Sequence, residues 1–347
     1  MSEFSTTIMA ARNGHLNCLE YAKRERCPMG IKSCEKAAQF GHLDCLIFAH
    51  ENGCPLTQAR NWTLFVTTLA AESGSLSCLK YAHEHGCPWD ESTAYYASQK
   101  GHLECLKYAH ENGCPWDEET TIYAASGGHL DCLCSTWWTS WNGCPWDEKY
   151  AHENGCQWTE YTFSHAARSG HLNCLKYLFE NNCPWNKYTT SNAASGGHLA
   201  CLKYAYENGC EWDEYTPSSA ALGNHILCLK YAYENNCPWN SYTTALASHN
   251  GHLDCLRYAH ENGCPWDHRT CVNASKKGHL ECLKYAHENG CEWNEIITVF
   301  AAMFGHLDCL KYAHENGCPW GDATCHLAEV NKNFECLEYA HNHGCPN

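Results

Sequence analysis

The chain has few basic residues and no long apolar run. It carries 23 Lys and Arg against 39 Asp and Glu, a formal net charge of −16. Binding to a phosphate backbone requires clustered basic side chains, so nucleic acid is not an expected partner. No segment approaches the roughly 18 consecutive apolar residues of a membrane span, and MSEFSTTIMAARNG at the N-terminus does not read as a secretion signal. We therefore expect a soluble intracellular protein that does not enter a membrane.

Catalytic motifs are missing as well. The sequence contains no phosphate-binding glycine loop, no G-x-S-x-G and no H-E-x-x-H, and no nucleophile is paired with a base outside the repeat described next. These absences argue against an enzyme and against a bound cofactor.

The chain consists of one repeated sequence unit. A Gly-His dipeptide, or its counterpart, recurs mostly every 27 residues, and twelve anchored copies fill the chain. The consensus is T-x-x-x-A-A-x-x-G-H-L-x-C-L-K-Y-A-H-E-N-G-C-P-W-D-E. The copies are anchored at Gly14, Gly41, Gly74, Gly101, Gly128, Gly170, Gly197, Asn224, Gly251, Gly278, Gly305 and Lys332. Such a period is the signature of a repeat array.

Each copy predicts two helices. In HLECLKYAHENG, Leu103, Leu106 and Ala109 recur at the three-residue spacing of a buried helical stripe. Gly113 follows as a left-handed C-cap, and a proline two residues later cannot continue the helix. Asp117 and its neighbours can then cap the next helix. We call the helix before Gly-His helix one and the helix after it helix two.

The order T-x-x-x-A-A-x-x-G-H-L-x-x-L followed by G-C-P-W-D resembles the ankyrin repeat, in the short GCPWDE form found in large DNA viruses and some protists and algae. The resemblance covers the whole chain and implies an all-α, right-handed helix-turn-helix solenoid of about twelve repeats. Ankyrin repeats are typically about 33 residues long, so these shorter copies predict that β-hairpin fingers are largely absent. Only the step from Gly41 to Gly74 keeps the full length.

One segment interrupts the period. Cys132 and Cys156 stand 24 residues apart where paired cysteines are otherwise nine apart. We expect one continuous array with N-terminal repeats over 1–131, an irregular joint over 132–158 and C-terminal repeats over 159–347. Trp137, Trp138 and Trp141 in the joint form a possible binding patch, or simply pack around an imperfect duplication.

The 29 cysteines and 24 histidines raise the question of metal or disulfide chemistry. Cys105 and Cys114 would lie about 13 Å apart along one helix, beyond the roughly 7 Å reach of a disulfide, and His110 lies roughly 140° around the helix from Cys105. We therefore expect no disulfide within a repeat, no metal site, and cysteines that act as small apolar core residues. Metal bound by cysteines outside the repeat register stays open as an alternative, at Cys34, Cys134, Cys271 and Cys325.

Two other repeated residues have structural interpretations. The histidine of Gly-His, such as His102, is expected to hydrogen-bond local backbone. Trp116 and its equivalents are expected to form a packed ladder beneath the loops.

Variation among the copies points to the binding surface. The two positions before Gly-His vary most, and the ankyrin resemblance places them on the concave helix-one surface that touches protein partners. The candidate partner-binding residues are Arg12, Asn13, Gln39, Phe40, Gln99, Lys100, Arg168, His249, Lys276, Lys277, Met303 and Phe304. Lys276, Lys277, Met303 and Phe304 form the sharpest candidate patch.

The sequence thus predicts a monomeric, non-enzymatic scaffold for a protein partner, in a reducing compartment such as the cytoplasm, of a host cell if the protein is viral. Two alternatives remain open: a thiol-rich buffer for metals or oxidants, and a structural component of a virus particle.

Overall fold

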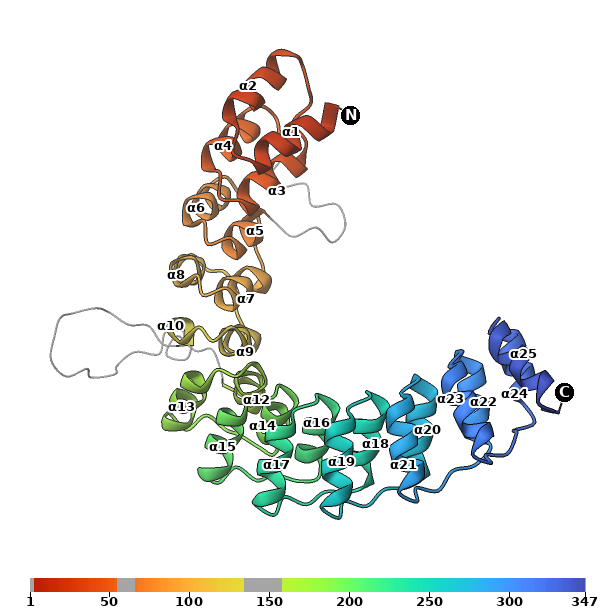
Figure 1. The fold of residues 1–347 in the computed structure, drawn as a ribbon. Coiled ribbons are helices and arrows are strands. Elements are labelled where there is room, and N and C mark those ends of the chain that lie inside the picture. The colour runs from red at the N-terminus through yellow and green to blue at the C-terminus, as the bar shows by residue number, and fades with distance from the viewer. Residues whose placement is uncertain (1–2, 55–65, 134–157, 347) are drawn as a thin grey trace. The chain divides into compact units, whose positions relative to one another are not determined.

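The computed structural model describes residues 3–54, 66–133 and 158–346, and within these every regular element is an α-helix. The chain divides into two compact units, Met1–Pro184 and Trp185–Asn347, here called unit 1 and unit 2. Both consist of short helices in pairs (Figure 1). The predicted joint at 132–158 falls almost wholly outside the described residues, so the domain bounds stay a prediction.

The described residues of unit 1 form six helix pairs. Its first helices are α1 (Glu3–Arg12), α3 (Ile31–Gln39), α5 (Val66–Glu72), α7 (Glu91–Gln99), α9 (Glu118–Gly127) and α12 (Glu160–Ser169). Its second helices are α2 (Leu16–Arg24), α4 (Leu43–Glu51), α6 (Leu76–Glu84), α8 (Leu103–Glu111), α10 (Leu130–Leu133) and α13 (Leu172–Glu180).

Unit 2 repeats the arrangement. Its first helices are α14 (Tyr188–Ser195), α16 (Tyr215–Leu222), α18 (Ser241–His249), α20 (His268–Lys277), α22 (Ile296–Phe304) and α24 (Thr324–Val330). Its second helices are α15 (Leu199–Glu207), α17 (Ile226–Glu234), α19 (Leu253–Glu261), α21 (Leu280–Glu288), α23 (Leu307–Glu315) and α25 (Phe334–Asn342). Twelve pairs match the twelve copies, which confirms the predicted all-α solenoid.

Within each unit the first helices pack side by side in one layer and the second helices in another. The first layer is lined by small buried residues such as Ala97, Ala124 and Thr120, which let neighbouring helices approach closely. The second helices contribute larger side chains, such as Leu106, to the space between layers. A repeat therefore buries its apolar face only by stacking on its neighbours.

The helix ends follow the sequence signals. Asp117 caps α9, and its side chain accepts a hydrogen bond from the backbone of Glu119 at 3.0 Å. Gly113 closes α8 at a positive φ of 82°, as expected for a left-handed cap. Arg26, which stands where the other copies have Gly or Asn, adopts the same backbone conformation with φ at 57°.

Candidate functional site

The predicted partner-binding residues lie at the C-terminal ends of the first helices or directly after them. Every one of the twelve is exposed or half-buried. Together they carry Arg12, Lys100, Arg168, Lys276 and Lys277, and no carboxylate. These twelve residues are therefore a basic set in a chain whose net charge is −16.

Two aromatic–cation pairs occupy equivalent positions in this set. The Arg12 guanidinium carbon lies 5.2 Å from the ring centroid of Phe40 in unit 1. In unit 2, the Lys276 ammonium lies 5.6 Å from the centroid of Phe300 and 5.7 Å from that of Phe304. Such distances bring the cation within reach of the negative face of the ring. Phe304 nevertheless stays 42% exposed.

Unit 2 adds further groups around this pair. Met303 is half-buried and precedes Phe304, and Lys277 is exposed at the last residue of α20. Partial burial, together with the charges of Lys277 and Lys276, lowers the pKa of His249, so its imidazole stays neutral near pH 7. We call Lys276, Lys277, Phe300, Met303 and Phe304 the α20–α22 patch; the sequence prediction missed Phe300.

The Trp137, Trp138 and Trp141 patch lies outside the described residues. Another set of exposed residues, which the sequence analysis missed, stands nine residues before four consecutive Gly-His positions or their counterparts. It comprises Tyr161, Tyr188, Tyr215 and Tyr242, each more than half exposed. The recurring Tyr-Thr pair at the start of these first helices was the available signal.

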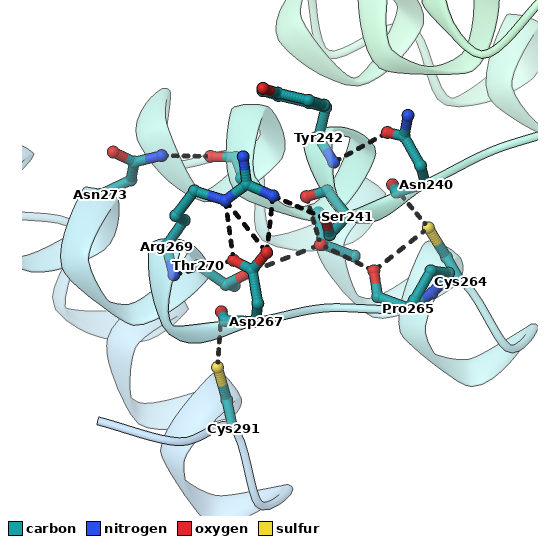
Figure 2. A network of polar contacts seen from close by, with 12 residues as sticks. Asn240, Ser241, Tyr242, Cys264, Pro265, Asp267, Arg269, Thr270, Asn273 and Cys291 are labelled. Atoms are coloured by element: carbon teal, nitrogen blue, oxygen red, sulfur yellow. Dashed lines mark hydrogen bonds and ion pairs between the residues drawn. The ribbon is translucent and has the colours of Figure 1, made fainter. Parts of the chain in front are cut away.

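In the next repeat the same position holds Arg269, which joins neighbouring repeats through a polar network (Figure 2). Its guanidinium forms an ion pair with Asp267 at 2.6 Å and donates to Ser241 Oγ at 2.8 Å. The guanidinium carbon also lies 4.5 Å from the ring centroid of Tyr242. The hydrogen bond from Arg269 lowers the pKa of Asp267. This network fixes the register between α18 and α20.

The histidine of Gly-His serves the repeat interface. His102 Nε2 lies 3.2 Å from the carbonyl oxygen of Glu72 in the preceding repeat, and His306 makes the equivalent bond to Lys276 at 3.1 Å. A carbonyl only accepts, so Nε2 carries the proton in each. The prediction of a backbone hydrogen bond is confirmed, although the acceptor belongs to the neighbouring repeat.

The tryptophans also pack as predicted. Trp266 stacks on His260 with 3.7 Å between ring centroids, and His260 Nδ1 lies 3.0 Å from the hydroxyl of Tyr285 in the next repeat. Tyr206 replaces histidine in the equivalent stack on Trp212. Since Tyr and His are exchangeable here, the ladder is a packing device and no proton transfer is common to the repeats.

Most cysteines have structural positions. Cys105 is buried on helix two, and burial raises the pKa of its thiol to about 12. The loop cysteine Cys114 donates its thiol to the carbonyl of Asp90 at 3.3 Å, closing helix one onto the loop of its own repeat. Burial also raises the pKa of Cys114 to about 12. These thiols remain protonated at neutral pH, contrary to what a thiol buffer requires.

The expectation that no disulfide forms within a repeat is wrong for one copy. Cys34 and Cys54 are joined by a disulfide, with Cα atoms 6.7 Å apart. That expectation concerned only cysteines such as Cys105 and Cys114, which lie on helix two and directly after it. Cys34 lies on helix one, and the packing of the two helices brings it to the loop cysteine.

The described residues contain no group of three or more His, Cys, Asp or Glu side chains placed to hold a metal ion. Over the same described ranges, no helix is long and apolar enough to cross a membrane.

These features define a helical repeat solenoid that displays a variable basic and aromatic surface. A family model for ankyrin repeats in many copies matches residues 68–110 and 271–314, one segment in each unit. Ankyrin repeats are thus recognised in this chain.

Among solved structures, 165 chains match. One is the crystal structure of the human ASB11 ankyrin repeat domain, which is 17% identical, with 59% of this chain and 84% of that chain covered and a TM-score of 0.34. A search of curated proteins returns no match. The viral or protist subtype expected from the GCPWDE loop is not shown by these comparisons.

Proposed function

We propose that the chain is a non-enzymatic scaffold that binds a protein partner through the exposed side of its first helices, with the α20–α22 patch at the centre of the contact. Ankyrin repeats generally mediate protein–protein interaction, and they are recognised here in both units. The observation that carries the proposal is Lys276 held between Phe300 and the exposed Phe304.

The α20–α22 patch offers a partner both aromatic area to bury and a positioned cation. A partly exposed aromatic ring still has apolar area to bury, and aromatic and basic side chains dominate the energetically important residues of protein interfaces. Lys276 is already positioned by the two rings, so little rotamer freedom remains to be lost on binding. Clustered cations on an acidic chain favour a partner segment that is acidic and apolar.

The layer arrangement supports a concave binding side. In unit 2 the first helices pack more closely on one another than the second helices do. A stack whose layers differ in this way curves toward the tighter layer, so the ends of α20 and α22 would line the inside of the curve.

We further propose that the protein acts as a monomer in a reducing compartment. The observation that supports a reducing compartment is that its described cysteines other than Cys34 and Cys54 are thiols, most of them buried. An intracellular setting, in a virus-infected host or otherwise, fits thiols that are kept reduced.

The test uses the full chain with a photo-crosslinking phenylalanine analogue in place of Phe304, followed by sequencing of the crosslinked peptide. We expect the crosslinked partner segment to be acidic and apolar. The variant Lys276→Glu should reduce crosslinking at least about tenfold, because it places a like charge against that segment.

Lys311→Glu is the matched control. Lys311 also lies over an aromatic ring, 5.7 Å from the centroid of Tyr339, but on a second helix. Equal loss of crosslinking in both variants, or crosslinks to basic segments, would contradict binding at the α20–α22 patch.

A further inference from the structure

Three repeats carry a cysteine at a position where most others carry threonine. Seven residues before the Gly-His position, or its Lys332 counterpart, stand Cys34, Cys271 and Cys325. Each lies on a first helix, and each is followed 20 residues later by the loop cysteine of the same repeat: Cys54, Cys291 and Cys345.

The threonines show where a side chain at this position points. Thr67 Oγ1 donates to the carbonyl of Pro88 at 2.8 Å. Thr298 Oγ1 donates to the carbonyl of Pro319 at 3.0 Å. In both cases the acceptor directly follows the loop cysteine. A cysteine in place of the threonine therefore lies beside the loop cysteine of its own repeat.

All three cysteine pairs meet this expectation. Cys34 and Cys54 are bonded. Cys271 and Cys291 are both buried, and each thiol shifts the pKa of the other. Cys325 and Cys345 lie in one buried cluster with Ala340, and burial together with the Cys345 thiol raises the pKa of Cys325.

We propose that Cys271–Cys291 and Cys325–Cys345 are disulfide-forming pairs of the same kind as Cys34–Cys54, so that oxidation closes three repeats with one recurring bond. The Cα separation of 6.7 Å in the bonded pair falls within the range that disulfides span. Equivalent backbone positions in the other two repeats present their sulfur atoms in the same way.

The chemistry needs only a peroxide. The Cys291 thiolate attacks one peroxide oxygen, the O–O bond breaks, and the departing hydroxide takes up a proton, leaving a sulfenic acid on Cys291. The Cys271 sulfur then attacks the sulfenic sulfur, water leaves, and the disulfide forms. Two thiols and one hydrogen peroxide yield one disulfide and two waters. Cys291 is the suitable first nucleophile, because the neighbouring Cys271 thiol lowers the pKa of the Cys291 thiol.

Each disulfide closes its repeat by fixing one end of the helix pair. It joins the first helix to the loop that follows the second helix, an attachment otherwise made by threonine hydroxyls and single thiol hydrogen bonds. For Cys325–Cys345 the closed repeat is α24 and α25, whose described neighbours are α22 and α23.

The experiment treats the full chain with hydrogen peroxide or with dithiothreitol, removes the reagent, alkylates remaining thiols after unfolding in urea, and maps unreduced peptides by mass spectrometry. We expect Cys271–Cys291 and Cys325–Cys345 crosslinks in the peroxide sample and alkylated cysteines in the reduced one. Cys264, whose repeat carries Thr244 at the paired position, is the internal control and should remain alkylatable throughout.

A matched variant separates pairing from general oxidation. Cys271→Thr installs the residue that neighbouring repeats use, so the fold should persist, and Cys291 should then be recovered as an alkylated thiol after peroxide. Retention of both Cys271 and Cys291 as thiols while Cys34–Cys54 is linked would overturn the proposal. Crosslinks of Cys291 to other cysteines at equal yield would overturn it as well.

Discussion

His306 reaches back across a repeat boundary and lies against the backbone of Lys276, with Nε2 3.1 Å from the carbonyl oxygen. In the copy anchored at Lys332, Asn333 stands in place of this histidine. Its Nδ2 donates a hydrogen bond to the carbonyl oxygen of Met303 at 2.7 Å, which again joins two repeats. The repeat interface thus accepts two chemical forms of side-chain donor at this position, an imidazole and a carboxamide.

His306→Ala should therefore destabilise unit 2 by about 1–3 kcal/mol, because a partly buried carbonyl loses its donor. His306→Asn should recover most of that loss, since the chain already uses asparagine at this position. The check is urea unfolding followed by circular dichroism. Equal midpoints for the alanine and asparagine variants would show that the hydrogen bond does not stabilise the interface.

Gly278 has a left-handed backbone and leaves room for the imidazole of His306. Its φ is 76°, and a Cβ added there would lie 2.5 Å from Nδ1 of His306. Gly290, in the same repeat, has a φ of 83°, but a Cβ added to it would meet no atom within 4 Å. Both glycines avoid backbone strain, and only Gly278 also makes room for the next repeat.

Gly290→Ala should cost about 1 kcal/mol from backbone strain alone. Gly278→Ala should cost at least about 1 kcal/mol more, because the imidazole has to move away from the carbonyl it bonds. Thermal unfolding of both full-length variants measures the difference. If the two midpoints coincide, the close contact with His306 is not a constraint on the sequence.

The repeat architecture could be predicted because the copies can be compared with one another. Leu106, Gly113 and Asp117 mark a buried stripe, a C-cap and an N-cap by local chemistry alone. Such local signals do not depend on how distant segments meet.

The contacts that the sequence analysis missed depend on tertiary packing. Cys34 and Cys54 lie on either side of a whole second helix, and their meeting follows from how that helix packs against the first. Phe300 joins Lys276 only because adjacent first helices stack in register. Neither relationship is contained in the spacing of residues within one helix.

Stability should decrease as the solution is acidified below neutrality. Burial lowers the pKa of His279 and of His287 from their ordinary value of 6.5. The unfolded chain then binds protons at a higher pH than the folded chain does, so stability is fully present above about pH 6.5 and falls below it. The urea midpoint should thus be lower at about pH 5.5 than at about pH 7.5.

The variant His279→Asn isolates one of these groups. Asparagine keeps a donor for the neighbouring carbonyl, as Asn333 does, but has no proton to gain in this range. The fall in midpoint between the two pH values should be smaller than in the unchanged chain. An unchanged pH dependence would mean that His279 titrates alike in the folded and unfolded states.

Thiol reactivity distinguishes packing residues from a thiol buffer. Cys18 is exposed on α2, whereas Cys105 and Cys114 are buried with thiol pKa values raised to about 12. Alkylation requires both a thiolate and access, so Cys18 should react at least about tenfold faster than the other two in the folded chain at about pH 7.5. Peptide mapping after timed exposure to iodoacetamide gives the three rates separately.

The same labelling in urea supplies the control, because unfolding removes burial and should bring the three rates together. A buffer for metals or oxidants requires reactive thiols in the folded state, and that requirement applies to Cys105 and Cys114 as the cysteines that recur in the repeat. Their rapid alkylation in the folded chain would favour the buffer over the scaffold. Slow alkylation would instead assign them to packing and to repeat closure, leaving the exposed ends of the first helices as the surface on which binding depends.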